Sequence, residues 1–325
     1  MEITLLGTGC PAVDTKRYGP AQVVRHGGHA VLVDCGSGVT QRLLGAGLSG
    51  RDLDAVLLTH LHSDHLVDLF QLIVSSWHQG RDRPQRVFGP PGTRAYVDGL
   101  MALWRAELEQ RIAHERRPST AALEIEVTEI GPLPGPGPGP GPAPGPGPGP
   151  GPGPGPGPGP APCEVLTLGE LRVTAFEVEH QPVRHAFGFA FETPEAKLVL
   201  SGDTRACAAV IEAARGAELL VHEVFVHRDM PVVAGLRSAE TVANVASYHT
   251  LSSEVGKVAA EAGVGILALT HFAPPGCDRE ALLAEVAADF AGPVVIGEDL
   301  MTLEPATGRI RHAGAVLGLG QRGVR

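Results

Sequence analysis

Three histidines and one aspartate lie within residues 60–65, in the order His60, His62, Asp64 and His65. Imidazole nitrogens and carboxylate oxygens are ligands that zinc and other first-row cations bind in proteins. A lone histidine among apolar residues is usually structural, but four such donors in so short a stretch are typical of metal ligands. We therefore expect a metal site here.

Two predicted elements flank this cluster. Residues 53–58 form a short aliphatic run typical of a buried strand, and residues 66–73 are typical of a helix. The donors therefore lie on a strand-to-helix loop, where α/β proteins commonly carry their chemistry. The same order of strand, polar residue and helix recurs along the chain and places further candidates at the same kind of edge: His180, Asp203, Glu223 and His271.

The rest of the chain also alternates strands and helices. Apolar runs and alternation predict strands at residues 3–6, 22–25, 30–34, 86–89, 171–178, 188–192, 197–200, 219–223 and 265–269. Helical periodicity predicts helices at residues 39–48, 93–117, 205–215, 252–262 and 278–290. The apolar stripe of helix 93–117 includes Trp104, which we expect in the core rather than at a substrate mouth.

Two features of the first third of the chain have alternative interpretations. Gly7 and Gly9 could belong to a dinucleotide-binding loop, but no third glycine follows at the right offset, so a tight turn is favoured. Asp34 ends a predicted strand, where it would be either a partner of a metal-bound histidine or a cap for the next helix. The sequence leaves both roles of Asp34 open.

The donors suffice for two cations. We assign His60, His62 and His180 to one metal ion, and Asp64, His65 and His271 to the other. Asp203 is assigned as the bridge between them. Two adjacent cations can hold a hydroxide as a nucleophile and bind the oxygens of a phosphoryl or acyl centre. We expect two Zn²⁺ ions, although Mn²⁺ and iron also accept this donor set.

Composition and charge exclude several classes of protein. The five cysteines are scattered without a C-x-x-C pair, so neither a disulfide framework nor a thiolate zinc site is indicated. No long apolar run or targeting segment is found, which predicts a cytoplasmic protein with no membrane partner. The formal net charge of −10 argues against a surface built for a phosphate backbone. Bound cations would still allow a local anion site.

Residues 131–162 consist almost entirely of alternating glycine and proline. Collagen requires glycine at every third position, so this period of two excludes a collagen helix. A tract that buries no apolar surface cannot offset its chain entropy, so we interpret it as a flexible low-complexity insert. A proline-rich docking ligand is the alternative. Residues 1–325 are otherwise expected to form a single domain.

The order of the motifs resembles the metallo-β-lactamase superfamily, and within it the ribonuclease Z-like branch. The matching pieces include the histidine cluster and, in order around it, Leu6-Gly7-Thr8-Gly9, Asp34-Cys35-Gly36, Val178-Glu179-His180, Ser201-Gly202-Asp203-Thr204, His222-Glu223, His249-Thr250 and Leu269-Thr270-His271-Phe272. The resemblance implies an α/β (α+β) fold, a four-layer αββα sandwich with two zinc ions at a strand edge. It also implies a homodimer.

Catalytic roles follow from the same resemblance. It implies that His249 protonates the leaving group or stabilises the oxyanion, and that Glu223 orients His249. Asp64 is expected to be both a metal ligand and a catalytic residue. The remaining histidines are expected to be surface or structural residues, except that His185 lies near enough to His180 to reach the rim of the pocket: His26, His29, His78, His114, His227 and His312.

One departure from the family bears on the substrate. Enzymes of this branch that mature transfer RNA commonly carry a basic, glycine-rich arm between the ligands that match His180 and Asp203. Here only residues 181–202 intervene, which leaves room for a β-hairpin, and the glycine/proline tract contains no Lys or Arg. We therefore favour a phosphodiesterase acting on a small ester. Nucleic acid is the less favoured partner.

Three alternatives remain open from the sequence. The first is transfer-RNA 3′ processing by a ribonuclease Z-type endoribonuclease. The second is an arylsulfatase or a lactonase of the same superfamily. The third, of a different class, is a non-catalytic metal-binding or interaction module that presents the glycine/proline tract to a partner.

Overall fold

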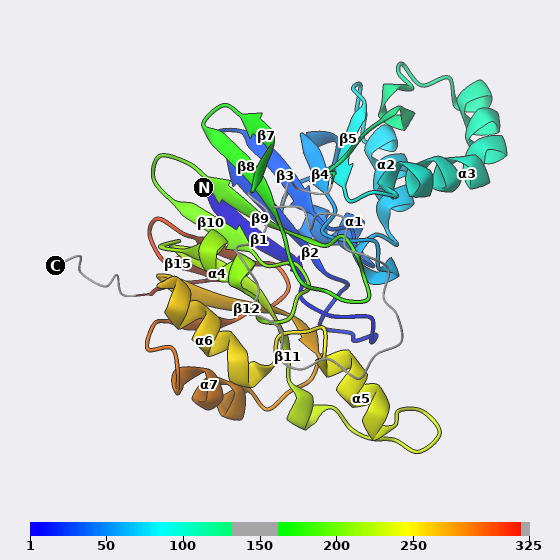
Figure 1. Ribbon diagram of the computed structural model, residues 1–325. Helices are drawn as coiled ribbons and strands as arrows, with labels where there is room; N and C mark the ends of the chain where they lie inside the picture. The colour runs from blue at the N-terminus through cyan, green and yellow to red at the C-terminus, as the bar shows by residue number, and fades with distance from the viewer. Residues whose placement is uncertain (132–161, 320–325) are drawn as a thin grey trace, which may run out of the picture.

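The computed structural model describes residues 1–131 and 162–319, which contain two β-sheets (Figure 1). The nine-stranded sheet has the spatial order β16 (Ala315–Gly318), β15 (Arg309–His312), β14 (Met301–Glu304), β1 (Glu2–Gly7), β2 (Ala21–His26), β3 (His29–Val33), β4 (Ala55–Leu57), β5 (Gln85–Gly89) and β6 (Ile125–Glu129). The seven-stranded sheet has the order β13 (Val294–Ile296), β12 (Ile266–Ala273), β11 (Leu219–Phe225), β10 (Lys197–Leu200), β9 (Phe187–Glu192), β8 (Leu171–Glu177) and β7 (Cys163–Leu168).

Helices follow the strands of both sheets. In the first half of the chain these are α1 (Val39–Gly45), α2 (Leu69–His78) and α3 (Thr93–Glu115). In the second half they are α4 (Ala208–Ala214), α5 (Ala239–Ala246), α6 (Ser252–Ala262) and α7 (Arg279–Ala287). Short 3₁₀ turns occur at Gly50–Asp52, Ser63–His65, Ala121–Leu123 and His227–Asp229.

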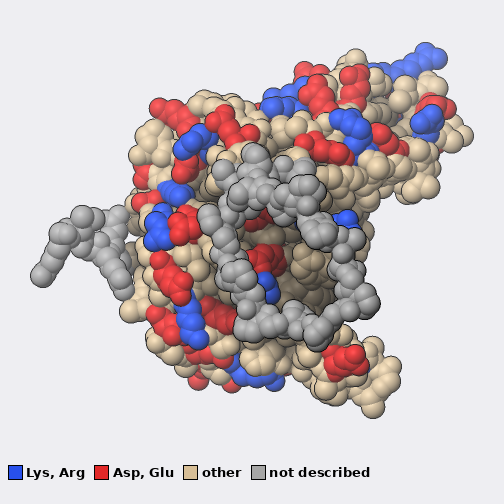
Figure 2. All heavy atoms as spheres, viewed as in Figure 1, with Lys and Arg blue, Asp and Glu red and all other residues tan. Residues whose placement is uncertain are grey.

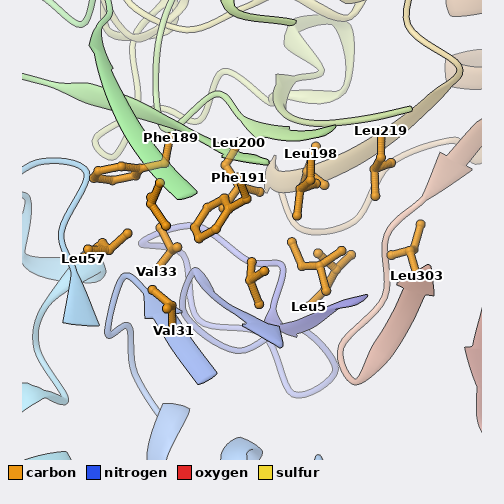
Figure 3. Packing of buried hydrophobic residues seen from close by; sticks show 14 of the residues in the cluster. Leu5, Val31, Val33, Leu57, Phe189, Phe191, Leu198, Leu200, Leu219 and Leu303 are labelled. Carbon is orange, nitrogen blue, oxygen red and sulfur yellow. The ribbon is translucent and has the colours of Figure 1, made fainter. Parts of the chain in front are cut away.

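Three layers of buried apolar side chains hold the sheets and helices together. Between the two sheets, side chains such as Leu5 and Val33 of one face Phe189 and Leu198 of the other (Figure 3). A second cluster joins the seven-stranded sheet to α4, α6 and α7, and a third joins the nine-stranded sheet to α1 and α2. The order helix, sheet, sheet, helix confirms the expected αββα sandwich.

Parallel pairing places the ends of several strands at one edge. In the nine-stranded sheet β4 lies parallel to β3 and β5. In the seven-stranded sheet β11 lies parallel to β10 and β12, with Glu223 in register with Thr270. Because the carboxyl ends of parallel strands meet at the same edge of a sheet, the segment after β10 lies beside the last residues of β11 and β12 in one sheet. In the other sheet the segment after β4 lies beside the ends of β3 and β5.

Many predicted elements agree with the structure, and several differ. The bounds of β10 and α6 are those expected, whereas β12 continues through His271 to Ala273. Residues 181–202 form the antiparallel β9–β10 hairpin, as predicted. The sequence patterns do not predict β6, β7, α5 or the strands β13 to β16, which are short or follow no clear apolar alternation.

The core position expected for Trp104 is wrong. Its side chain is 44% exposed and its ring stacks on Phe70 at 4.7 Å. Helix α3 extends away from the body of the molecule in Figure 1, and it buries only Thr93, Val97 and Leu108. Only part of the apolar stripe therefore reaches the core: Leu108 is buried, whereas Leu103 is 81% exposed.

The glycine/proline tract falls almost wholly outside the described residues. Its flanks are described: β6 is an edge strand of one sheet, and β7 is an edge strand of the other. The tract therefore connects the two sheets at their edges. Among the described residues, no helix has the length and apolar character needed to span a membrane.

Candidate functional site

Seven histidine and aspartate side chains from four separate segments gather at the common strand edge. The potential ligand atoms of His60, His62 and His180 lie within 4.8 Å of one another. Those of Asp64, His65 and His271 form a second group under the same limit. These are the two sets of donors that the sequence assigned to separate cations, so the structure brings each set together.

Asp203 lies between the two groups. Its Oδ2 atom is 4.0 Å from Nε2 of His60 in one group. It is 3.3 Å from Nε2 of His65 and 3.2 Å from Nε2 of His271 in the other. Asp64 Oδ2 approaches only the second group, at 3.6 Å from His65 and 3.5 Å from His271. One carboxylate oxygen is therefore within reach of donors from both groups.

Asp34 orients donors in both groups. His65 donates a hydrogen bond from Nδ1 to Asp34 Oδ2 at 2.8 Å. The Thr59 hydroxyl donates to the same carboxylate at 2.9 Å and accepts from Nδ1 of His60 at 3.0 Å. With Nδ1 occupied, the Nε2 atoms of both rings keep their lone pairs for a ligand. The sequence left two roles open for Asp34, and the structure shows that it is a partner of a histidine in the cluster. It does not cap α1, because the N-cap residue of that helix is Gly38.

The buried donor atoms fit a cation. Within the part of the chain that the structure describes, Nε2 of His60, His65 and His271 is buried and has no hydrogen-bond partner. Buried polar atoms normally have a partner, because leaving one unpaired costs free energy. Several unpaired nitrogen lone pairs that converge on a carboxylate are the arrangement expected where a divalent cation supplies the missing partner.

The electrostatic environment shifts the pKa values of the clustered histidines in opposite directions. Burial lowers the pKa of His60 well below its usual value, and the neighbouring histidines lower it further. Burial also opposes the charged form of His65, but the carboxylates of Asp203 and Asp34 outweigh it and hold the pKa of His65 well above its usual value. A proton and a cation therefore compete for His65, so metal binding must release that proton.

His249 and Glu223 form a hydrogen-bonded pair beside these donors. His249 donates from Nδ1 to Glu223 Oε1 at 2.8 Å, and the backbone N–H of Thr204 donates to the same oxygen at 2.8 Å. Burial lowers the pKa of His249, but the Glu223 carboxylate outweighs this effect and raises the pKa to about 9. Glu223 thus holds the imidazole of His249 through its Nδ1 atom.

Tyr248 is a site residue that the sequence analysis missed. Its ring lies 5.1 Å from the ring of His180 and 4.7 Å from the ring of His249, measured between centroids. Its backbone carbonyl accepts a hydrogen bond from His180 Nδ1 at 3.0 Å. In the sequence, only its position directly before His249 indicated that Tyr248 would lie at the site.

A cavity of about 560 Å³ opens beside Asp64. One wall is the loop after β1, including Cys10 and Val13, and the opposite wall includes Ser63 and Val67. A cavity of this size accommodates a small organic molecule next to the cluster.

The other histidines lie outside the cluster. His185 Nδ1 lies 3.4 Å from Glu177 Oε1, and His185 belongs to none of the groups of potential ligands among residues 1–131 and 162–319. His29 pairs with Asp54 at 3.2 Å, and His78 lies 3.8 Å from Glu115. A surface or structural role for His29 and His78 agrees with these contacts.

Comparison with known proteins agrees with this fold. Residues 1–128 match the family model described as anti-Pycsar protein Apyc1, and residues 160–272 match the beta-lactamase superfamily domain. A ribonuclease Z of Mycobacterium sp. (strain KMS) is 35% identical over 308 residues, which cover 94% of this chain and 96% of the relative.

Two solved structures share the architecture. The metallo-beta-lactamase fold protein YhfI from Bacillus subtilis has a TM-score of 0.65 and 21% identity, covering 93% of this chain and 97% of YhfI. The short form of human tRNase Z has a TM-score of 0.64 and 20% identity, covering 94% of this chain and 99% of the human protein.

The αββα fold and its cluster of histidines and carboxylates define a metal-binding hydrolase of the metallo-β-lactamase superfamily. Within that superfamily the chain belongs to the ribonuclease Z family, because the similarity to those proteins extends over almost the whole chain. The resemblance inferred from the motifs is thereby confirmed.

Proposed function

We propose that the protein is a phosphodiesterase that binds two zinc ions and hydrolyses a small phosphodiester. The observation that carries this proposal is the position of Asp203 Oδ2, within 4.0 Å of donors from both groups. A pair of cations held by such groups supplies an activated water molecule and neutralises charge on phosphate oxygens.

In this proposal each group of donors has one task. His60, His62 and His180 hold one cation, and Asp64, His65 and His271 hold the other, with Asp203 shared. The donor set also suits Mn²⁺ or iron.

His249 is the proposed proton donor to the leaving alcohol. Its Nδ1 proton is held by Glu223 at 2.8 Å, so Nε2 is the atom free to serve the substrate. The Glu223 carboxylate raises the pKa of His249 to about 9, which favours the protonated ring that a proton donor requires. Glu223 acts through His249 as a positioning residue.

Two observations support a small substrate. The β9–β10 hairpin fills the interval in which relatives that process transfer RNA commonly carry a basic arm. On the face shown in Figure 2, the Lys and Arg residues of the described chain are interspersed with Asp and Glu and form no continuous basic track. A long phosphate backbone gains little affinity from such a surface.

Hydrolysis of bis(4-nitrophenyl) phosphate, followed by release of nitrophenol with metal content measured in parallel, tests the proposal. We expect turnover and close to two zinc ions per chain. A panel with aryl sulfates and lactones serves as the comparison. Preferential turnover of either ester class, or fewer than one bound cation per chain, would contradict the proposal, and the second result would favour a non-catalytic role.

The second candidate is 3′ processing of transfer-RNA precursors. It is favoured by the 35% identity to a ribonuclease Z over 94% of this chain. Incubation with a 3′-extended transfer-RNA precursor distinguishes this candidate from the small-substrate phosphodiesterase. A single cut after the discriminator base would establish the second candidate and overturn the preference for a small substrate.

A further inference from the structure

A small inter-sheet cavity lies beside the donor cluster, and its walls include residues of both sheets. Gln22 and Val33 belong to the nine-stranded sheet, and Glu223 and Thr270 belong to the seven-stranded sheet. His271, one of the assigned metal ligands, also lines this cavity. The cavity has a volume of about 20 Å³. Roughly 10–15 Å³ is enough for one water molecule, so the inter-sheet cavity accommodates a single water.

Three polar atoms in the walls of the inter-sheet cavity have no hydrogen-bond partner among the described residues. They are Oε2 of Glu223, Oγ1 of Thr270 and Nδ1 of His271, and all three are buried. Glu223 uses its other oxygen, because Oε1 accepts from His249 and from the backbone N–H of Thr204, each at 2.8 Å. A buried polar atom without a partner costs free energy. A buried water typically makes about three hydrogen bonds, which is the number of unpaired atoms here.

His271 differs from the other histidine donors in what its Nδ1 atom contacts. Nδ1 of His65 donates to the Asp34 carboxylate at 2.8 Å. Nδ1 of His180 donates to the Tyr248 carbonyl at 3.0 Å. Nδ1 of His271 has no such partner within the described chain, although its Nε2 atom faces the donor cluster. A metal-bound histidine normally donates its second ring N–H to a carboxylate, a carbonyl or a water, and this bond fixes the orientation of the ring.

The backbone at His271 explains why no side chain of the neighbouring strand pairs with it directly. Glu223 of β11 lies opposite Thr270 of β12. The next pair is Val224 opposite Phe272, so His271 is the extra residue of a β-bulge. Its φ of 46° lies in the left-handed region. A bulge redirects a side chain and leaves the extra residue without a partner across the ladder, whereas the register pair Glu223 and Thr270 stays together in the cavity wall.

We propose that the inter-sheet cavity binds one structural water molecule, and that Thr270 is a positioning residue that holds this water against Nδ1 of His271. The inference rests on His271 as a metal ligand in the proposed function and is independent of the substrate. When Nε2 of His271 binds a cation, Nδ1 carries the proton and donates it to the water. The water donates to Oε2 of Glu223 and shares its third hydrogen bond with the Thr270 hydroxyl. A cation in the same place would face the Nδ1 proton, so these donors and acceptors select water. The water also connects His271 to Glu223, the residue that orients His249.

A high-resolution crystal structure of the zinc-loaded protein tests the water site directly. We expect one ordered water within about 3.2 Å of Oε2 of Glu223, Oγ1 of Thr270 and Nδ1 of His271. Thr270→Val keeps the shape of the side chain and removes the hydroxyl, so the water should be absent from the crystal structure of this variant. The wild-type crystal structure decides the water site even if Thr270→Val does not fold.

Competition with a chromogenic chelator tests the positioning role without turnover. Thr270→Val should bind zinc roughly 10-fold more weakly, the lower range for loss of a group that orients a metal ligand. Thr270→Ser keeps the hydroxyl and should restore the wild-type affinity. The matched control is Thr174→Val, which removes a hydroxyl from β8 of the same sheet, outside the donor cluster, and should leave the affinity unchanged.

The outcomes separate this inference from the proposed function. If the wild-type protein binds zinc but Thr270→Val binds it equally well, or if the wild-type cavity holds no ordered water, the inference is wrong and the proposed function stands. A wild-type protein that binds no zinc contradicts the proposed function itself.

Discussion

Substitution of Asp203 and substitution of His62 should remove different numbers of bound cations from the proposed metal centre. Asp203→Ala removes the one oxygen near both groups, so we expect loss of more than one bound cation and no measurable hydrolysis of bis(4-nitrophenyl) phosphate. His62→Ala removes a donor from one group only, so about one cation should be lost, again with loss of hydrolysis. Metal analysis and the diester assay measure both effects. His78→Ala, which replaces a histidine on the surface helix α2, is the matched control, and retained turnover in Asp203→Ala would contradict the assignment.

Asp34 is expected to orient the metal-binding histidines rather than to bind a metal ion itself. Asp34→Asn cannot accept from both His65 Nδ1 and Thr59 through one carboxylate, so His60 and His65 would lose their fixed tautomers. Losing such a partner typically lowers metal affinity about 10- to 100-fold. Competition with a chromogenic chelator measures that affinity. An unchanged affinity, in a variant whose unfolding midpoint is also unchanged, would show that Asp34 has no role in ordering the donors.

At the scale of elements, the turn after β1 depends on close backbone approach. A Cβ atom added at Gly7 would lie 1.9 Å from the Gly19 carbonyl oxygen. We expect Gly7→Ala to destabilise the protein by about 3 kcal/mol, because backbone has to move to relieve the overlap. Urea unfolding measures the change.

Gly99 provides the matched control for that substitution. It lies within α3, and an added Cβ would meet nothing within 4 Å. Because alanine favours the helix, Gly99→Ala should stabilise the protein by up to about 1 kcal/mol. Equal effects of the two substitutions would show that the overlap at Gly7 is relieved without cost.

At the scale of the whole molecule, the glycine/proline tract joins the edges of the two sheets. Replacing residues 132–161 with a linker of about ten Gly and Ser residues should change the free energy of unfolding by only about 1 kcal/mol, because loop-closure entropy depends weakly on length. Thermal unfolding measures this change, and metal content reports whether the sheet edge stays intact. A fall of many degrees in Tm would show that the tract packs against the domain, and the single-domain interpretation would then have to include it.

The sequence predicted the fold class through its family resemblance, and it supplied the candidate donors. Strand and helix periodicity is local, so β10 and α6 were predicted with their observed bounds. The donors His60 to His65 lie in one short loop, and His180, Asp203 and His271 each follow or end a predicted strand. Residue type and position at a strand end therefore indicated the site before any contact was known.

Local patterns failed where the outcome depended on distant neighbours. The apolar stripe of α3 predicted a buried Trp104, but whether a helix face is covered depends on how far the helix extends beyond the sheet. Tyr248 has no pattern of its own, and only the folding of the β11–α6 segment back to the strand edge brings it to His180.

The sequence by itself determined which segments are strands and helices in most of the chain, and its motifs, through the family resemblance, implied the two-sheet architecture and the candidate side chains that could hold cations. Asp203 was assigned as the bridge from the sequence, and the tertiary structure supplied the distances that place it near both groups. Only the tertiary structure decided that Asp34 orients a histidine in each group and that Tyr248 borders His249. The reason is physical: periodicity and composition act through neighbours along the chain, whereas these distances depend on the order and register of strands that are far apart in sequence.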